Sequence, residues 1–169
     1  MHPTAQKVAG AARALGLEIS IKESEASTRT AQEAANAIGC TLAQIVKSLL
    51  FVVDGQPAIV LMSGANQLDD RQLAGLCQVS RKKIKRGDAD IAREATGFAI
   101  GGIPPFGHSS RLPTYIDQDF LQFEVIWAAA GTPNAVFAIT PEALAQATHG
   151  LMVNLKVETD ANSSPAQSS

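Results

Sequence analysis

Cysteine and histidine are scarce in this chain of 169 residues, and their scarcity excludes several kinds of site. The two cysteines, Cys40 and Cys77, form no CxxC pair, and the three histidines are scattered, so no zinc or redox spacing is present. The sequence also lacks an HExxH motif, a GxSxG elbow, a P-loop and a GxGxxG fingerprint. We therefore expect no metal and no cofactor, and find no evident nucleophile.

Long apolar segments and a secretory leader are also missing from the sequence. The composition is 46% hydrophobic and 18% charged, which is ordinary for a globular protein, and the length fits one domain with its own core. The net charge of −2 means that contact with nucleic acid would require a local basic patch. These features predict a cytoplasmic protein with reduced, structural thiols and no membrane partner.

Residues 46–53, VKSLLFVV, form the most strand-like segment of the sequence. Asp54-Gly55 predicts a turn, and residues 58–62 return as the hairpin partner. Both faces of the strand are largely apolar, which predicts cover on both sides, and Lys47 interrupts the pattern. Its ammonium either reaches the rim to pair with a carboxylate or faces a ligand, because an unpaired buried charge costs several kcal/mol. A phosphate or a developing oxyanion would be the functional partner.

The segment GFAIGGIPPFGH, residues 97–108, combines backbone freedom with stiffness. Gly101 and Gly102 permit positive φ or a close approach of another segment, and Pro104 fixes the backbone that follows. Such a loop either directs backbone N–H groups toward a carbonyl or serves only as a tight connection, and local composition slightly favours the connection. His108 ends the loop, and a lone histidine of this kind is more often structural than catalytic.

Residues 81–86, RKKIKR, hold five basic side chains, those of Arg81, Lys82, Lys83, Lys85 and Arg86. Most runs of this kind are solvated faces. This run is equally consistent with the local positive patch that an acidic protein needs to bind a phosphate backbone.

The remaining signals outline a single domain over residues 1–157 and a polar, disordered tail over residues 158–169. We expect an early half-buried strand at residues 17–22 and a last strand at residues 153–157. Capping patterns predict helices at residues 31–38, 70–77 and 89–96.

These motifs occur in the order found in the YbaK/ProX family of aminoacyl-tRNA editing domains, which the chain resembles from about residue 27 to residue 156. The same fold resembles the editing insertion of bacterial prolyl-tRNA synthetases. The matching segments are TAQEAA (30–35), IVKSL (45–49), SGAN (63–66), the loop at 97–108 and AGTP (130–133). The strand lysine and the Gly-Gly-x-Pro-Pro-x-Gly loop together make the resemblance specific.

The resemblance implies an α/β single domain with a mixed, partly barrel-like β-sheet wrapped by helices. It implies hydrolysis of the ester that joins a wrong amino acid to the 3′-terminal adenosine of tRNA, without metal or cofactor. Lys47 would be the catalytic residue, holding the terminal phosphate region or the ester by its charge, while a ribose hydroxyl of the substrate assists the attacking water. The expected substrate-binding residues are Thr30, Ser48, Ser63, Asn66, Gly101, Gly102, Ile103, Pro104, His108, Asp117, Gly131, Thr132, Pro133 and Asn134.

One departure from the family concerns Asn134, because some members carry a histidine in this second glycine loop. The edited amino acid therefore stays open among small residues, on tRNA-Pro or another tRNA, since small pockets discriminate poorly. We expect a free-standing trans-editing deacylase with mischarged tRNA as partner and an aminoacyl-tRNA synthetase as a second candidate partner. Two other interpretations are a non-catalytic module that binds aminoacyl-tRNA or a synthetase, and a hydrolase of small esters or thioesters unrelated to tRNA.

Overall fold

The computed structural model describes residues 1–24 and 30–158, so the predicted tail lies outside the described residues apart from its first position. The α-helices are α1 (Pro3–Ala14), α2 (Ala31–Ile38), α3 (Asp70–Cys77), α4 (Ala89–Thr96) and α5 (Pro141–Thr148). Short 3-10 helices are η1 (Leu42–Gln44), η2 (Arg81–Lys83) and η3 (Gln118–Gln122). The strands are β1 (Ile21–Glu23), β2 (Val46–Val53), β3 (Gln56–Ser63), β4 (Ile84–Arg86), β5 (Thr114–Asp117), β6 (Ile126–Ala129), β7 (Ala135–Ile139) and β8 (Leu151–Val153).

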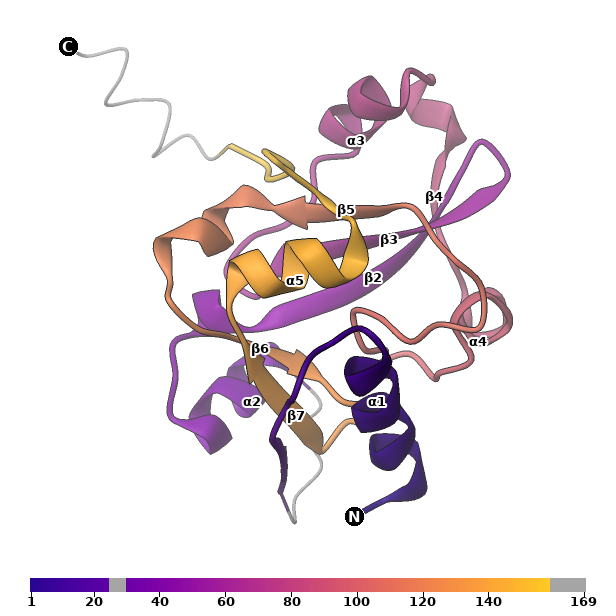
Figure 1. Ribbon diagram of the computed structural model, residues 1–169. Coiled ribbons are helices and arrows are strands. Elements are labelled where there is room, and N and C mark those ends of the chain that lie inside the picture. The colour runs from indigo at the N-terminus through magenta and orange to yellow at the C-terminus, as the bar shows by residue number, and fades with distance from the viewer. Residues whose placement is uncertain (25–29, 159–169) are drawn as a thin grey trace, which may run out of the picture.

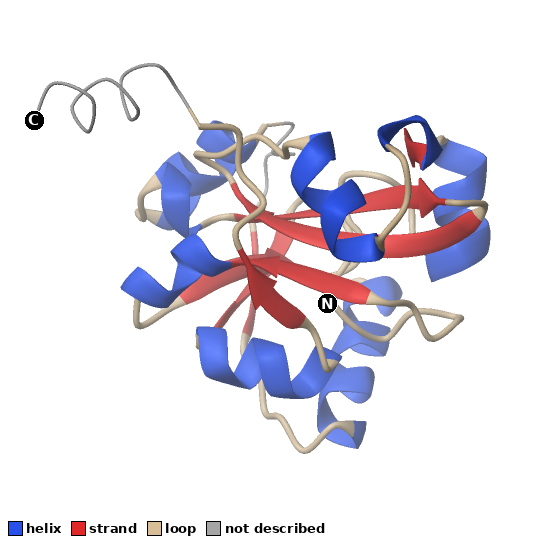
Figure 2. Cartoon of the chain, turned by 90° about the horizontal axis from the view of Figure 1, so that it is seen from above, coloured by secondary structure: helices blue, strands red, loops and turns tan. Residues whose placement is uncertain are grey.

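The strands form two sheets with helices around them (Figure 1). The larger sheet has the order β4-β2-β3-β5-β8, in which β5 runs parallel to both neighbours and the other pairs are antiparallel. The smaller sheet, β1-β7-β6, is antiparallel. The view from above shows the strands at the centre and the helices at the periphery (Figure 2). The predicted mixed α/β domain is confirmed, although over the described residues the two sheets do not close into a barrel.

Strand β2 is covered on both faces, as its apolar pattern predicts. Val46 and Leu50 belong to one core, which α1, α4 and α5 also enter. Phe51, on the opposite face, packs into a second core with Leu73 of α3. In Figure 1, α5 lies in front of this sheet and α3 lies above it. The two faces therefore follow directly from the period of two along a strand.

The hairpin of β2 and β3 is also confirmed, with pairs running from Val46 opposite Ser63 to Val53 opposite Gln56. The turn places Asp54 at φ 49° and Gly55 at φ 83°, a left-handed pair of residues that matches the twist of the two strands.

The predicted strands at residues 17–22 and 153–157 were wrong in their limits. Strand β1 spans only Ile21–Glu23, because only those residues lie opposite β7, although Leu17 and Ile19 still pack against the core. Strand β8 spans Leu151–Val153, the residues that lie opposite β5. Pairing partners, and not local alternation, set both limits.

Candidate functional site

A cavity of about 250 Å³ lies along an uncovered edge of β2. Strand β4 pairs with β2 only at residues 51–53, and β6 meets its start through a bridge between Ile45 and Trp127. Between these two contacts, residues 46–49 of β2 form one wall of the cavity. We call it the β2-edge cavity. Of the predicted site residues, it brings together Thr30, Lys47, Ser48, Gly101, Ile103 and Pro133.

Lys47 lines this cavity with a half-buried side chain. Its ammonium donates a hydrogen bond to the backbone carbonyl of Asn66 (Nζ–O 2.7 Å), and no ion pair with a carboxylate joins it in the described part of the chain. Burial lowers the pKa of Lys47, and repulsion by Arg86 lowers it further, against a smaller opposing effect of Asp117. An ammonium has three donors, so the bond to one carbonyl leaves two for a ligand.

Ser48 offers polar groups to the same cavity. Its hydroxyl oxygen is buried and has no hydrogen-bond partner among the described residues. The backbone N–H and C=O groups of Ser48 also face the uncovered edge. On that edge Leu50 O accepts a hydrogen bond from Gly87 N (2.9 Å), and the backbone groups of residues two apart on an antiparallel strand face the same edge. A ligand that bonds to this hydroxyl would remove the cost of an unsatisfied buried group, about 1–3 kcal/mol.

Ser63, Asn66 and Asp117 lie together, but they support Lys47 without lining the cavity. The Asp117 carboxylate is 1% exposed and accepts hydrogen bonds from Ser63 N (3.1 Å) and Asn66 Nδ2 (2.8 Å). Asn66 is thereby fixed at the end of β3, and its carbonyl receives the Lys47 ammonium. Of the three, only Asn66 contacts the lysine, and no sequence signal distinguishes this group from the residues that line the cavity.

Asp119 and Lys156 form the outer end of this network, with Lys156 Nζ 3.0 Å from Asp119 Oδ2. Burial raises the pKa of Asp119, but hydrogen bonds from Lys156 and Asn66 and the charge of Lys156 outweigh it, so the net pKa lies below its ordinary value. A carboxylate with a lowered pKa stabilises the fold above the ordinary pKa of aspartate, and this contribution disappears as pH falls through the lowered pKa.

We therefore expect Asp119→Asn to reduce the free energy of unfolding by about 1 kcal/mol at neutral pH. The expected loss is this small because both side chains of the ion pair are about one-quarter exposed, and water screens their attraction. The difference from the wild type should shrink below about pH 4. Urea titrations of both proteins at several pH values measure it. A difference that is independent of pH would contradict a role for the ionised carboxylate.

The two glycine loops contact each other at Gly102. Gly102 is buried, and its N–H donates to Ala99 O (3.1 Å), so this group closes a turn and does not face the cavity; only Gly101 of the pair lines it. A Cβ at position 102 would lie 2.7 Å from Gly131 O. The two loops thus approach each other as closely as the glycines predict. The Gly102 N–H is engaged within its own loop, so of the two glycines only Gly101 remains at the cavity.

Gly102→Ala is expected to destabilise the protein by about 1–3 kcal/mol, because the methyl group would collide with backbone that cannot rotate away. The matched control is Gly75→Ala in α3, where nothing lies within 4 Å of the added atom. That control should be neutral or stabilising by up to about 1 kcal/mol, since alanine favours helix. Urea denaturation compares the two, and equal stabilities would show that the loops can separate freely.

The second glycine loop borders a smaller cavity of about 150 Å³, which Asn134 lines. Ala34 and Val136 line both this cavity and the β2-edge cavity, so the two cavities are neighbours. Asn134 is held by Nδ2 to the carbonyl of Ser24 (3.0 Å), and Thr132 donates to its Oδ1 (3.0 Å). The amide is therefore engaged by protein groups, next to the larger cavity and not inside it.

His108 and Pro104 do not line the β2-edge cavity. His108 lines a separate, open depression of about 390 Å³, and its Nε2 is 2.7 Å from the carbonyl of Pro104. Burial lowers the pKa of His108, which favours the neutral ring, against a smaller opposing effect of this carbonyl. The structure does not bring His108 into the β2-edge cavity, and its observed contact is one that stiffens the loop.

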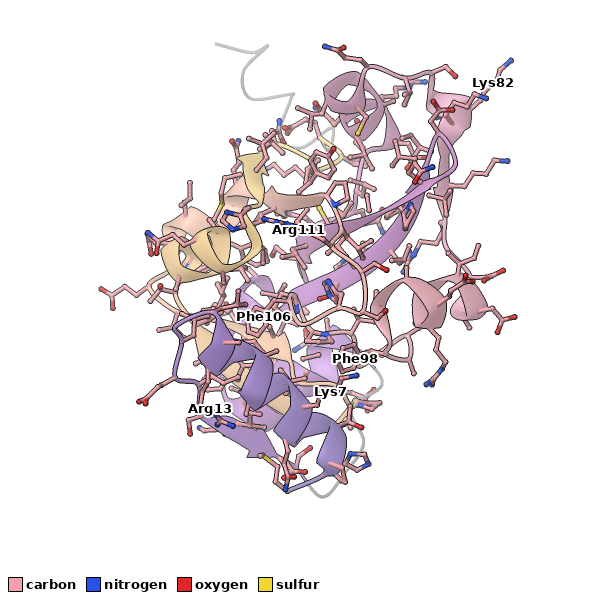
Figure 3. The ribbon with its side chains drawn as sticks, turned by 45° about the vertical axis from the view of Figure 1, so that its right-hand side comes forward. Lys7, Arg13, Lys82, Phe98, Phe106 and Arg111 are labelled. Carbon is pink, nitrogen blue, oxygen red and sulfur yellow. The ribbon has the colours of Figure 1, made fainter. Side chains whose placement is uncertain are left out.

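The basic run divides between two elements. Arg81, Lys82 and Lys83 lie on η2, and Lys85 and Arg86 on β4, all five exposed. Figure 3 shows Lys82 at the top of the molecule, well separated from Lys7, whose ammonium lies 5.1 Å from the centre of the Phe98 ring. Arg86 is different from its neighbours because it lines the β2-edge cavity. Its position inside a cavity was missed, since the run reads as one surface patch.

Trp127 and Ile100 also line the β2-edge cavity and were not among the predicted residues. Ile100 is half exposed. The ammonium of Lys22 lies over the Trp127 ring, 5.1 Å from its centre.

Within residues 1–24 and 30–158, no group of three His, Cys, Asp or Glu could hold a metal ion, and no helix is long and apolar enough to cross a membrane. Cys40 and Cys77 are both free thiols.

Known proteins are similar to this chain in sequence and in fold. The family described as the aminoacyl-tRNA editing domain matches residues 25–147. YwhH of Bacillus subtilis (strain 168) is 30% identical over 129 residues, which are 76% of this chain and 81% of YwhH. The proline--tRNA ligase of Maridesulfovibrio salexigens is 33% identical over 78 residues, 46% of this chain but only 13% of the ligase.

A crystal structure of a provisionally assigned trans-editing enzyme for prolyl tRNA synthetase superimposes with a TM-score of 0.89. Its sequence is 42% identical, and the match covers 94% of this chain and 99% of that one. A second solved structure, of the hypothetical protein APE2540, has a TM-score of 0.82 at 24% identity and supports the fold alone.

Proposed function

This chain belongs to the aminoacyl-tRNA editing domain family, and we propose on that basis that it is a free-standing deacylase. Its substrate would be tRNA that carries a small, wrongly attached amino acid, with tRNA-Pro the first candidate because of the relatives that are proline--tRNA ligases. The observation that supports this most is a lysine ammonium without a carboxylate partner among the described residues, in a cavity that also holds Ser48 and Gly101.

The reaction needs charge stabilisation more than a nucleophilic side chain. Water adds to the ester carbonyl carbon, the carbonyl oxygen becomes negative, and collapse of this intermediate releases the amino acid while the ribose oxygen takes up a proton. The described residues that line the β2-edge cavity include no Asp, Glu or His. A ribose hydroxyl of the substrate would therefore assist the water, and Lys47 would stabilise the negative charge or hold the adjoining phosphate.

The cavity walls favour a small amino acid. Ala34, Ile103 and Trp127 contribute apolar surface around a volume of about 250 Å³. Ser48 adds to this wall a hydroxyl that has no hydrogen-bond partner among the described residues. Since apolar pockets separate near-isosteres by only about 1–3 kcal/mol, we expect several small amino acids to be accepted to different degrees.

A deacylation panel tests the proposal. Transfer RNAs carrying alanine, cysteine, serine, threonine or proline are incubated with the protein, and the release of free amino acid is measured. We expect release from at least one mischarged tRNA and none from correctly charged prolyl-tRNA. Tight binding without release from any of them would favour a binding module instead. Release that is insensitive to salt and equally fast from simple amino-acid esters would favour a general esterase.

A further inference from the structure

Arg86 occupies the rim of the β2-edge cavity in a defined orientation. In the β2–β4 ladder it lies opposite Phe51, and its guanidinium carbon is 5.6 Å from the centre of the Phe51 ring. Phe51 and Lys47 are four residues apart on one strand, so both side chains leave the same face of the sheet. The two cations therefore flank the cavity from neighbouring strands, about 14 Å apart at the backbone.

Neither cation forms an ion pair with a carboxylate of the described residues. The ion pairs between described residues join Lys83 to Asp54 and Lys156 to Asp119, and neither includes Arg86 or Lys47. Their mutual repulsion is one cause of the lowered pKa of Lys47. Two like charges at one cavity disfavour each other until an anion lies between or beside them. A guanidinium that lies over an aromatic ring can still bind a phosphate oxygen pair, because its planar fork matches that geometry.

We propose that Arg86 binds a phosphodiester of the tRNA 3′ end, upstream of the aminoacylated adenosine, and that the RNA strand leaves the cavity along β4 toward η2. This inference rests on the proposed function and adds the path of the RNA to it. Lys85 is exposed on the same short strand, and Arg81, Lys82 and Lys83 follow on η2. The run then provides an electrostatic track whose inner end is Arg86. The more common role of such a run, a solvated face, leaves the position of Arg86 in the cavity unexplained.

The test compares Arg86→Gln with Arg13→Gln. Arg13 is an exposed arginine on α1, which Figure 3 shows well separated from Lys82 on η2. Each variant is assayed on mischarged tRNA and on 3′-aminoacyl-adenosine, which keeps the ester and the terminal nucleoside but has no phosphate. Binding of uncharged tRNA is measured in parallel by fluorescence anisotropy over a range of salt concentrations.

For Arg86→Gln we expect about a 10-fold or greater loss of kcat/KM on tRNA, mainly in KM, and no loss on aminoacyl-adenosine. The slope of log affinity for tRNA against log salt should decrease by about 1, while Arg13→Gln changes neither quantity. Arg86→Lys should recover part of the binding. An equal loss on both substrates, or unchanged tRNA binding, would overturn the proposal. If no substrate is hydrolysed but Arg86 still governs tRNA binding, the deacylase proposal fails and the RNA path stands.

Discussion

Replacing Lys47 with alanine is expected to lower kcat/KM for a mischarged tRNA by roughly 100-fold or more, the scale seen when one group that stabilises a developing oxyanion is removed. The expectation follows from the surroundings of the ammonium. It is half-buried, it bonds to one carbonyl, that of Asn66, and no carboxylate pairs with it in the described residues. Its charge is therefore available to the substrate, and no other lysine lines the described part of the β2-edge cavity.

Two further variants separate charge from shape. Lys47→Met keeps the length and apolar stem, so it should fold and still lose most of the activity. Lys47→Arg keeps the charge with a different donor geometry, so it should retain more activity than Lys47→Met. Initial rates of amino-acid release measure the effect, and thermal denaturation verifies that each variant is folded. If the alanine and methionine variants match the wild type, Lys47 has no part in the reaction and the proposed site loses its main support.

The elements that the sequence predicts well are those specified by neighbouring residues. The strand Val46–Val53 and its return after Asp54-Gly55 are confirmed, because alternation and turn chemistry act over a few residues. Capping is local in the same way. Thr30 accepts a hydrogen bond from Glu33 N (3.1 Å) at the start of α2, and Gly39 ends that helix with a left-handed backbone, as the pattern predicts.

The site itself depends on contacts between distant segments, and those are not encoded in local pattern. Arg86 reaches the cavity only because β4 pairs with the last three residues of β2, which fixes Arg86 opposite Phe51. A shift of one residue in that pairing would turn Arg86 to the other face. The joining of Ser63 and Asn66 to Asp117 spans more than 50 residues of sequence. Both the position of Arg86 and the hydrogen bonds to Asp117 therefore depend on how the strands pair in the assembled sheet.

The loop at residues 97–108 shows the same division between local and distant information. Its stiffness and its need for glycine are predicted, and Gly102 does meet another backbone segment, at Gly131. The direction in which each group points is not predicted. Gly101 faces the β2-edge cavity, whereas His108 lies in a different depression and bonds to Pro104 within the loop.

Asp117→Asn should destabilise the fold more than Asp119→Asn and at least as much as Gly102→Ala. One carboxylate oxygen of Asp117 accepts hydrogen bonds from Ser63 N and Asn66 Nδ2, and the other accepts from Asp119 N (3.0 Å). The side chain is 1% exposed, so water cannot replace a lost partner. An asparagine has one accepting oxygen, and its NH₂ group would face at least one of these donors. We expect a loss of about 3 kcal/mol, since buried donors without partners cost about 1–3 kcal/mol each.

For a chain of this size, that loss corresponds to a fall in Tm of roughly 6–12 °C. The control is Asp54→Asn, which removes an exposed carboxylate 3.8 Å from Lys83 and should change stability by less than about 0.5 kcal/mol. Because Asn66 holds the Lys47 ammonium, Asp117→Asn should also lower deacylation at temperatures where the variant is still folded. Lost stability with unchanged kcat/KM would mean that the network supports the fold without positioning the lysine. A fall in both stability and kcat/KM would indicate that the Asp117 carboxylate supports catalysis through two hydrogen bonds, from Asn66 to Asp117 and from Lys47 to Asn66.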